Sequence, residues 1–530
     1  MDKKTKFILG LCVGTSSAKA IITDSKGNVI CSSEIQYGID SPFSLWTEQN
    51  PEVWFESSIK VIADVMNKSK LDKNDFICMG ISGQMHSTVF LDSKNNVIRP
   101  AILWNDQRTT NECRYLLENI GLKKILEMTS NRPINSFSLP KILWLKNNEN
   151  QNYKKLKKFC LSKDYIKLKF SGVLSTDPSD ASGTLCYDLK NGIWSRDILK
   201  EVSINPSILP DITPSAEISG FLSKDMAEIT GLPKDLPIIT GVADTAGEMI
   251  GNNINKNGDC LIKLGTGGDI LVYNENYIEN DGSFDLFKYP YKGFYTIQVT
   301  LSAAASQNWA LNKMGLDYKS FFDDAGEGIS FLDLKRQINN NKYQYIEDQI
   351  AKIRPGSNGL LFLPYMNGER SPYSDPNAKG TIIGLNLNTS RDEIFRSVLE
   401  GVGFSIKDCH KLLLDKGYQI DRMVISGGGA KSELWCQIFS DILNSEIIKM
   451  STDEGPSLGV CILSSVALKL YCSVEEASKK FLKIKKVYMP DENNAQKYKD
   501  LFDIYHQSYK NLKNIFKKIN DFIIRNNYSG

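Results

Sequence analysis

Residues 7–16 read FILGLCVGTS, an apolar run that ends in a glycine-threonine turn. The chain continues through residues 17–30 as SAKAIITDSKGNVI, which indicates a second strand, a turn at Gly27 and a third strand. Residues 259–273 repeat this plan, because DCLIKL is followed by the turn GTGG and by the apolar run DILVY. Two such strand-turn-strand units predict two related α/β domains with a boundary near residue 250.

Strand-like and helix-like segments alternate after the first unit. Residues 52–66 have apolar side chains at helical spacing, and residues 76–81 form an apolar run that ends near Gly83. From residue 494 onward, apolar and aromatic side chains recur every three or four positions, which predicts an amphipathic helix. We therefore expect an N-terminal domain over residues 1–250, a C-terminal domain over 251–490 and a helical tail over 491–530.

The composition is that of an ordinary globular protein: 41% of the 530 residues are hydrophobic and 24% are charged. The 64 Lys and Arg residues nearly balance the 62 Asp and Glu residues, for a net charge of +2. This balance gives no electrostatic footprint for nucleic acid or a membrane surface. No apolar run approaches the ~20 residues that a membrane-spanning helix needs. We expect neither nucleic acid nor a membrane as a partner.

The cysteines and histidines narrow the chemistry further. The eleven cysteines are dispersed and never form a CxxC pair, which indicates reduced thiols in a cytoplasmic protein. Three histidines are too few for a His-rich metal site. Lysines followed by an apolar run at the N-terminus have the layout of a secretory signal, but Gly10 and Gly14 interrupt the run. We therefore interpret residues 7–13 as a core strand.

Two glycine-threonine turns, Gly14-Thr15 and Gly265-Thr266, follow the first strands of the two units. Glycine lets a backbone approach a phosphate closely, and the threonine hydroxyl with neighbouring N–H groups can donate hydrogen bonds to phosphate oxygens. Either turn alone is also typical of a structural hairpin. Together, at equivalent points of two domains, they could bind a polyphosphate from both sides.

A third glycine turn lies in residues 424–432, which read VISGGGAKS between an apolar strand and a helix. Gly428 and Gly429 would leave room for a flat ring or a ribose, and the helix N-terminus suits negative charge. The pattern is neither the Rossmann nor the Walker motif. A tight strand-helix turn explains it equally well.

Residues 237–247 read PIITGVADTAG, an apolar strand followed by Asp244 at the start of a helix. Asp244 could be a helix N-cap or a general base aimed at a substrate. Gln84, Met85 and His86 follow the strand at 76–81, and Asp106 lies in the later run ILWNDQR. Both segments place hydrogen-bonding groups beside aromatic or thioether surface, a mixture that suits a polyol. A lone histidine such as His86 is more often structural.

Taken together, these segments resemble the FGGY family of carbohydrate kinases, and within it the xylulokinases. The resemblance covers roughly residues 7–470. Its two long signatures are SFSLPKILWLKNN at 136–148 and GTIIGL at 380–385, which continues to SVLE at 397–400. The xylulokinase-like marks are LWTEQ at 45–49, GQMH at 83–86, WNDQR at 104–108, KDY at 163–165, FLPY at 362–365 and GER at 368–370.

The resemblance implies two ribonuclease-H-like domains, as in actin and hexokinase, around a central cleft. It implies transfer of the ATP γ-phosphoryl group to a ketopentose, D-xylulose giving D-xylulose 5-phosphate, with Mg²⁺ as cofactor. The partners would be a small-molecule sugar and ATP, and a homodimer would be usual for the family.

The resemblance also implies roles for the residues above. Asp244 would be the general base. The sugar-side residues would be Gln84, Met85, His86, Asp106 and Asp244, and the ATP-side residues would be Gly14, Thr15, Gly265, Thr266, Gly428 and Gly429. No side chain is assigned as a metal ligand.

The sequence departs from the family pattern at the phosphoryl-transfer centre. Cys12 stands where the first turn of the family has an aspartate, and Ala243 and Thr245 flank Asp244 where xylulokinases have Gly and Asn. A thiol is a poor ligand for Mg²⁺, which prefers oxygen donors. Alternatives are therefore a catalytically impaired sugar- or nucleotide-binding relative, a kinase for another pentulose or polyol, and an actin-like ATPase.

Overall fold

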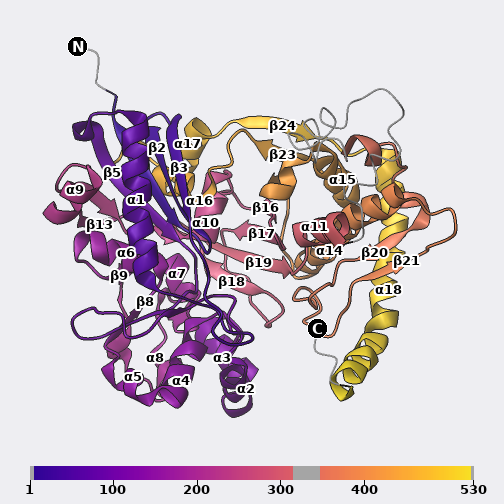
Figure 1. Ribbon diagram of the computed structural model, residues 1–530, viewed down its shortest axis with the longest axis horizontal. Coiled ribbons are helices and arrows are strands. Elements are labelled where there is room, and N and C mark those ends of the chain that lie inside the picture. The colour runs from indigo at the N-terminus through magenta and orange to yellow at the C-terminus, as the bar shows by residue number, and fades with distance from the viewer. Residues whose placement is uncertain (1–4, 314–346, 527–530) are drawn as a thin grey trace. The chain divides into compact units, whose positions relative to one another are not determined.

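The computed structural model describes residues 5–313 and 347–526 (Figure 1). The lysines before residue 5 and the last four residues of the expected tail lie outside the described residues. By their contacts the residues form two units, each described separately below. The first comprises Met1–Asn257, Tyr273–Thr296 and Glu454–Lys483, and the second comprises Gly258–Val272, Ile297–Asp453 and Ile484–Gly530.

The first unit is built on a seven-stranded sheet of order β13-β14-β5-β1-β2-β3, with β15 paired to β5. Its strands are β1 (Phe7–Val13), β2 (Ser17–Asp24), β3 (Val29–Gln36), β5 (Phe76–Gly83), β13 (Ile218–Phe221), β14 (Pro237–Ile239) and β15 (Val242–Ala243). β1 is antiparallel to β2 and parallel to β5. All seven residues of β1 are buried, as expected of a central strand in an α/β sheet.

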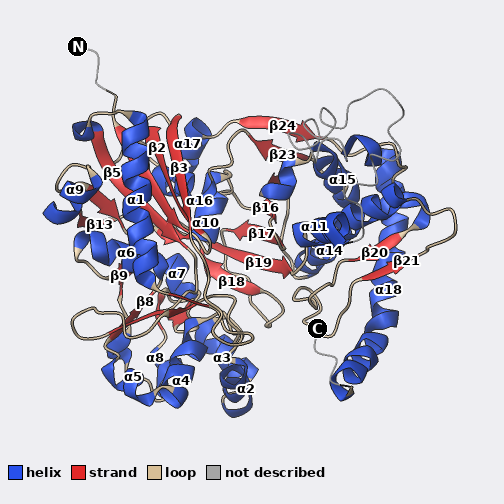
Figure 2. Ribbon diagram, viewed as in Figure 1, coloured by secondary structure: helices blue, strands red, loops and turns tan. Residues whose placement is uncertain are grey.

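Helices cover both faces of this sheet. α1 (Pro51–Ser69) begins at Asn50, whose side chain accepts a hydrogen bond from the Glu52 N–H, and it packs on β2 and β3 (Figure 2). α16 (Gly455–Ala467) packs on β1 and β5. The strands and the helix expected from residues 7–83 are therefore confirmed.

Smaller elements complete the first unit. The helices are α2 (Thr110–Asn119), α3 (Leu122–Thr129), α4 (Ser138–Asn148), α5 (Asn150–Lys155), α6 (Ser162–Ser171), α7 (Pro178–Ser182), α8 (Arg196–Glu201), α9 (Lys224–Thr230), α10 (Asp244–Gly251) and α17 (Val474–Phe481). The short strands are β4 (Glu48–Gln49), β6 (Val89–Leu91), β7 (Ala101–Ile102), β8 (Lys158–Cys160), β9 (Ser175–Thr176), β10 (Tyr187–Asp188), β11 (Ile193–Trp194) and β12 (Asp211–Ile212).

A second seven-stranded sheet has the order β18-β19-β17-β16-β22-β23-β24. Its strands are β16 (Asp259–Leu264), β17 (Gly268–Asn274), β18 (Asp285–Lys288), β19 (Phe294–Thr300), β22 (Arg422–Ser426), β23 (Ile447–Met450) and β24 (Ile484–Tyr488). β16 is antiparallel to β17 and parallel to β22, the same arrangement as β1 with β2 and β5. The predicted repeat of the strand-turn-strand plan is thus confirmed, and so is the α/β class.

The remaining elements lie in the second unit and are mainly helical. They are α11 (Ala304–Lys313), α14 (Arg391–Asp415), α15 (Glu433–Leu443), α18 (Glu492–Arg525), and the strands β20 (Leu361–Leu363) and β21 (Thr381–Ile383). α18 is the amphipathic helix expected after residue 494, with Tyr498, Tyr505 and Phe516 buried. Among the described residues, no helix is long and apolar enough to cross a membrane.

Close glycine contacts join α10 to α16 within the first unit. A β-carbon at Gly459 would lie 2.1 Å from the carbonyl oxygen of Gly247, and one at Gly251 would lie 2.3 Å from that of Gly455. Such approaches exclude any larger residue unless a backbone moves. These contacts fix the axis of α10, the helix that Asp244 begins.

We expect Gly459→Ala to lower the free energy of unfolding by about 3 kcal/mol, because its methyl group overlaps the Gly247 carbonyl. Helix propensity alone would favour alanine by about 1 kcal/mol, so a loss isolates the contact. The matched control is Gly403→Ala inside α14, whose methyl group meets only the movable end of the Ile442 side chain at 2.5 Å. Urea denaturation measures the free energy of unfolding of both variants. Equal losses of stability in the two variants would contradict the prediction.

Candidate active site

Three neighbouring strand ends bring candidate residues to one edge of the first sheet. β1 and β5 run parallel, with Val13 opposite Gly83, and β15 places Ala243 opposite the same Gly83. The segments that leave these ends carry Gly14, Thr15, Gln84, Met85, His86 and Asp244. The structure therefore collects residues that are far apart in the sequence.

Asp244 is the first residue of α10, and backbone N–H groups bind its carboxylate. The Met85 N–H donates to Asp244 Oδ1 at 3.2 Å, and the Thr245 N–H donates to the same oxygen at 2.8 Å. The positive end of the helix further favours the ionised form. The interpretation of Asp244 as the helix N-cap is wrong, because Ala243 occupies that position.

A buried polar network contacts Ala243, the residue that precedes Asp244. The Ala243 N–H donates to Ser179 Oγ at 3.0 Å, and Ser179 Oγ donates to Asp177 Oδ2 at 2.6 Å. Asp177 also pairs with the buried Lys163, whose Nζ lies 3.0 Å from Asp177 Oδ1 and 3.0 Å from Asp180 Oδ2. The network ties the residue before Asp244 to a buried cation.

The network contains more carboxyl groups than cations, and the pKa values of Asp177 and Asp180 shift in opposite directions. Lys163 also contacts Asp164 at 2.6 Å, so one ammonium faces three carboxyl groups. Burial would raise the pKa of Asp177, but Lys163 and the serine hydroxyls hold it below its ordinary value. Burial raises the pKa of Asp180 well above its ordinary value. Sequence reasoning noted the KDY run only as a family mark and missed its partners.

His86 is held from several sides. Its backbone adopts φ +67°, and its Nδ1 lies 2.9 Å from the Gly183 carbonyl oxygen. Since a carbonyl only accepts, Nδ1 carries the proton, and in a neutral ring Nε2 is then an acceptor. The ring lies against Phe137 and Phe287, and Lys141 Nζ donates to the His86 carbonyl at 2.8 Å.

Gln84 and Met85 are buried beside it. Gln84 Nε2 donates to Gln49 Oε1 at 3.1 Å, and Gln84 Oε1 accepts from Ser87 Oγ at 3.1 Å. The Gln84 amide is therefore engaged within the protein. Met85 is linked to Asp244 through its backbone N–H.

Asp106 organises its loop. Its carboxylate, fully buried, accepts from the Thr47 N–H at 2.7 Å and from Arg108 Nε and Nη2 at 2.9 and 2.7 Å. The Arg108 guanidinium lies 3.8 Å from the ring centroid of Trp46. These bonds hold the loop that carries Trp104.

The first glycine-threonine turn is bound by three side chains. Tyr37 OH donates to the Gly14 carbonyl at 2.7 Å, and Gln49 Nε2 donates to the Thr15 carbonyl at 2.8 Å. Trp104 Nε1 donates to Thr15 Oγ1 at 2.9 Å. Because that hydroxyl oxygen accepts from the indole, its own proton can point to another acceptor.

Cys12 lies in β1, just before this turn, and is 8% exposed. Its cross-strand neighbours are Lys19 on β2 and Ser82 on β5. Lys19 Nζ forms an ion pair with Glu454 Oε2 at 2.7 Å. Burial raises the pKa of the Tyr37 phenol, and the charge of a Cys12 thiolate adds to that shift.

The remaining candidates belong to the second unit. The N–H groups of Ala304 and Ala303 donate to the carbonyls of Gly265 and Thr266, both at 3.0 Å, so the start of α11 supports this turn. A β-carbon at Gly428 would meet no atom within 4 Å, whereas one at Gly429 would lie 2.8 Å from Leu264 Cβ. Gly428 therefore leaves open space, and Gly429 serves packing.

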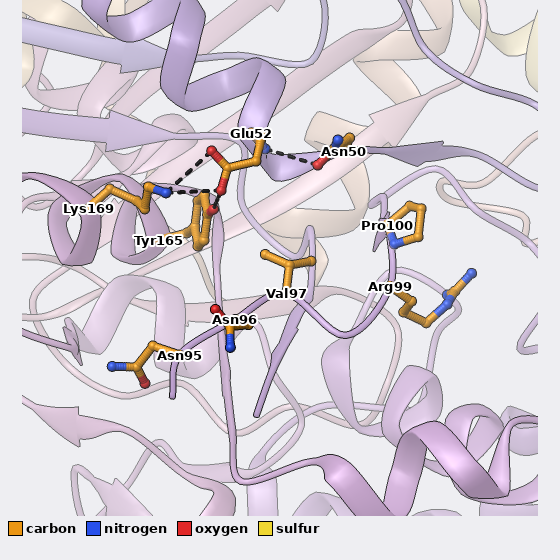
Figure 3. A pocket seen from close by; sticks show the side chains of 9 residues that line it. All are labelled: Asn50, Glu52, Asn95, Asn96, Val97, Arg99, Pro100, Tyr165 and Lys169. Atoms are coloured by element: carbon orange, nitrogen blue, oxygen red, sulfur yellow. Dashed lines mark hydrogen bonds and ion pairs between the residues drawn. The ribbon is translucent and has the colours of Figure 1, made fainter. Parts of the chain in front are cut away.

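A separate polar pocket of about 400 Å³ opens in the first unit (Figure 3). At one side, Glu52 accepts hydrogen bonds from Tyr165 and, at 3.0 Å, from Lys169. The lining residues are Asn50, Glu52, Asn95, Asn96, Val97, Arg99, Pro100, Tyr165 and Lys169. None of the residues predicted from the sequence as site residues is among them.

Comparison with protein families identifies the kind of protein that carries this candidate site. Residues 7–251 match the N-terminal domain of the FGGY family of carbohydrate kinases, and residues 260–468 match its C-terminal domain. The chain belongs to the FGGY family of carbohydrate kinases. This FGGY chain is an ATP-dependent sugar kinase similar to the xylulose kinases.

Alignments with individual relatives cover nearly the whole length of this kinase. Xylulose kinase of Bacillus subtilis is 34% identical over 520 residues, covering 98% of this chain and 99% of that protein. Two solved structures from Lactobacillus acidophilus, a gluconate kinase and a ligand-bound xylulose kinase, each have a TM-score of 0.87 and 25% identity. Each alignment covers 97% of this chain and 100% of the other.

The two glycines at 428 and 429 offer a test that separates packing from binding. We expect Gly429→Ala to destabilise the kinase by about 1–3 kcal/mol, because its methyl group overlaps Leu264 and Trp435. Gly428→Ala should leave the free energy of unfolding unchanged. If nucleotide approaches this backbone, Gly428→Ala raises the KM for ATP, which steady-state kinetics measures. An unchanged KM would remove Gly428 from the site.

Proposed function

We propose that this kinase transfers the γ-phosphoryl group of ATP to the 5-hydroxyl of D-xylulose, with Asp244 as the general base. The single observation that carries the proposal is the Met85 N–H bond to Asp244 Oδ1, which joins the carboxylate to the Met85-His86 pair. The similarity to xylulose kinases supports D-xylulose as the acceptor. The equal similarity to a gluconate kinase structure makes gluconate, or another pentulose or polyol, the second candidate.

The base would act through an anion that is already stabilised. The Met85 and Thr245 N–H groups and the start of α10 keep the Asp244 carboxylate ionised, the form that accepts a proton. Phosphoryl transfer depends mainly on alignment and on stabilising negative charge, so a well-placed carboxylate suffices as the base. The sugar hydroxyl would lose its proton to Asp244 while its oxygen attacks the γ-phosphorus, and the bond from that phosphorus to the β–γ bridging oxygen would break, so that ADP leaves.

The sugar would lie against Met85 and His86. A neutral His86 ring with its proton on Nδ1 presents an acceptor at Nε2, which matches a sugar hydroxyl as donor. Gln84 and Asp106 would act on the sugar side by holding their segments, since both side chains are bonded within the protein.

The phosphates would be bound by the glycine-threonine turns. Thr15 Oγ1 accepts from Trp104 and so can donate its proton to a phosphate oxygen, and Thr266 lies in the equivalent turn of the second unit. Gly14, Gly265 and Gly428 complete the proposed ATP side, whereas Gly429 supports it by packing on Leu264.

Mg²⁺ would enter bound to the triphosphate. In the described part of the chain, no three His, Cys, Asp or Glu side chains form a group that could hold a metal ion. The Asp244 carboxylate supplies the hard oxygen that Mg²⁺ prefers, whereas the Cys12 thiol does not. When bound, Mg²⁺ would neutralise charge on the transferred phosphoryl group.

We expect Asp244→Asn to lower kcat by at least ~10²–10⁴-fold, because the amide cannot accept the proton. The measurement is ADP release with Mg-ATP, with and without D-xylulose, and with gluconate in parallel. Asp225→Asn, a carboxylate in the first turn of α9, is the matched control and should keep full activity. Undiminished turnover by Asp244→Asn would show that Asp244 is not the base. ADP release stimulated only by gluconate would make gluconate the substrate.

Cys12→Asp tests the altered turn. We expect the natural protein to turn over and Cys12→Asp to raise kcat by about tenfold, equivalent to about 1.4 kcal/mol, since a carboxylate adds an oxygen donor near the phosphates. Cys12→Ser controls for loss of the thiol. An unchanged kcat would show that the thiol is tolerated. A natural protein that binds ATP or sugar but does not turn over would support the impaired, binding-only alternative.

A further inference from the structure

We infer that Gln49 is a positioning residue that couples the sugar-side segment to the phosphate-binding turn. The inference rests on the proposed function, because it needs Thr15 on the phosphate side and Gln84 to His86 on the sugar side. Gln49 lies in β4, only 2% exposed, and is not among the residues that sequence reasoning selected.

The Gln49 amide uses its full hydrogen-bonding capacity. Nε2 donates to the carbonyl oxygens of Thr15 and Gly38, both at 2.8 Å. Oε1 accepts from Trp54 Nε1 at 2.8 Å and from Gln84 Nε2 at 3.1 Å. A primary amide has two N–H donors and two lone pairs, and all four have partners here.

These partners come from four different segments. Thr15 follows β1, Gly38 follows β3, Trp54 lies in α1, and Gln84 follows β5. Trp54 is fully buried, so it holds the Gln49 amide against the core. One rigid side chain thus bonds directly to the backbone of the phosphate turn and to the side chain that precedes Met85 and His86.

The consequence for catalysis is geometric. A shift of the Gln84 segment moves Oε1, and the planar amide passes this shift to the Thr15 carbonyl through Nε2. Transfer reactions lose about 10²-fold from a misplacement near 1 Å. Sugar binding at Met85-His86 should therefore change the affinity for ATP, and loss of Gln49 should weaken that coupling.

The first variant is Gln49→Met, which keeps the length of the side chain and removes all four hydrogen bonds. We expect kcat/KM for ATP to fall about 10- to 100-fold, and the effect of D-xylulose on ATP affinity to disappear. The matched control is Asn280→Leu, because Asn280 is also a buried amide that donates to two carbonyls, those of Ser130 and Phe284 at 3.0 and 2.7 Å, and neither partner is a candidate site residue. Both variants should melt at lower temperature, but Asn280→Leu should keep its kinetic constants.

The second variant, Gln49→Glu, keeps the acceptor for Trp54 and Gln84 but turns an oxygen toward the carbonyls of Thr15 and Gly38. The ionised form repels both carbonyls, while the protonated form can donate one hydrogen bond. The activity of Gln49→Glu relative to the natural protein should therefore rise as the pH falls. This readout remains available if Gln49→Met does not fold.

The outcomes separate the inference from the proposed function. If the natural protein shows no sugar-dependent ADP release, the proposed function fails. If it is active and Gln49→Met keeps kcat/KM and the sugar effect while melting lower, the role of Gln49 is structural and the inference is overturned. A pH-independent activity ratio for Gln49→Glu would overturn it as well.

Discussion

The parallel pairing of β1 with β5 is the constraint on which the candidate site depends. Its register places Val13 opposite Gly83, so the Gly14-Thr15 turn and the segment from Gln84 to His86 leave the sheet at the same edge. β15 joins β5 in the same direction and delivers Asp244 beside them. A register slip of one residue would turn every side chain of β1 to the opposite face. Strand register therefore brings the backbone segments of the proposed site together, and the side chains act from the positions that the register sets.

Sequence reasoning predicted the local elements of this arrangement well. A few consecutive apolar residues are enough to predict the strands at 7–13, 76–83 and 259–264. The glycines that follow predict the turns. The return of Glu454–Lys483 to the first unit has no such local signal, because it depends on glycine contacts between α10 and α16. The three-part division at residues 250 and 490 stays a prediction, as do the homodimer and the assigned site roles.

The site residues that sequence reasoning missed have partners far along the chain. Gln49 bonds to Thr15 and Gln84, and Lys163 bonds to Asp177 and Asp180 through contacts that no spacing rule reveals. Both residues lie in runs that mark the resemblance to xylulokinases, LWTEQ and KDY. The sequence therefore pointed to these runs but assigned no function to Gln49 or Lys163. A buried amide or ammonium in such a run is costly unless it is fully bonded, and this cost would have been a reason to ask what each one binds.

The charge around Cys12 explains how the first turn accommodates a thiol. Cys12 and Lys19 are cross-strand partners, so their side chains share one face of the sheet, and Lys19 is paired with Glu454 just before α16 begins. An aspartate at position 12 would compete with Glu454 for that ammonium and leave one excess negative charge near the Gly14-Thr15 turn. Cys12 brings no carboxylate to this face, so the Lys19–Glu454 pair keeps its one-to-one pairing. Cys12→Asp therefore raises kcat only if the added oxygen donor outweighs this excess negative charge.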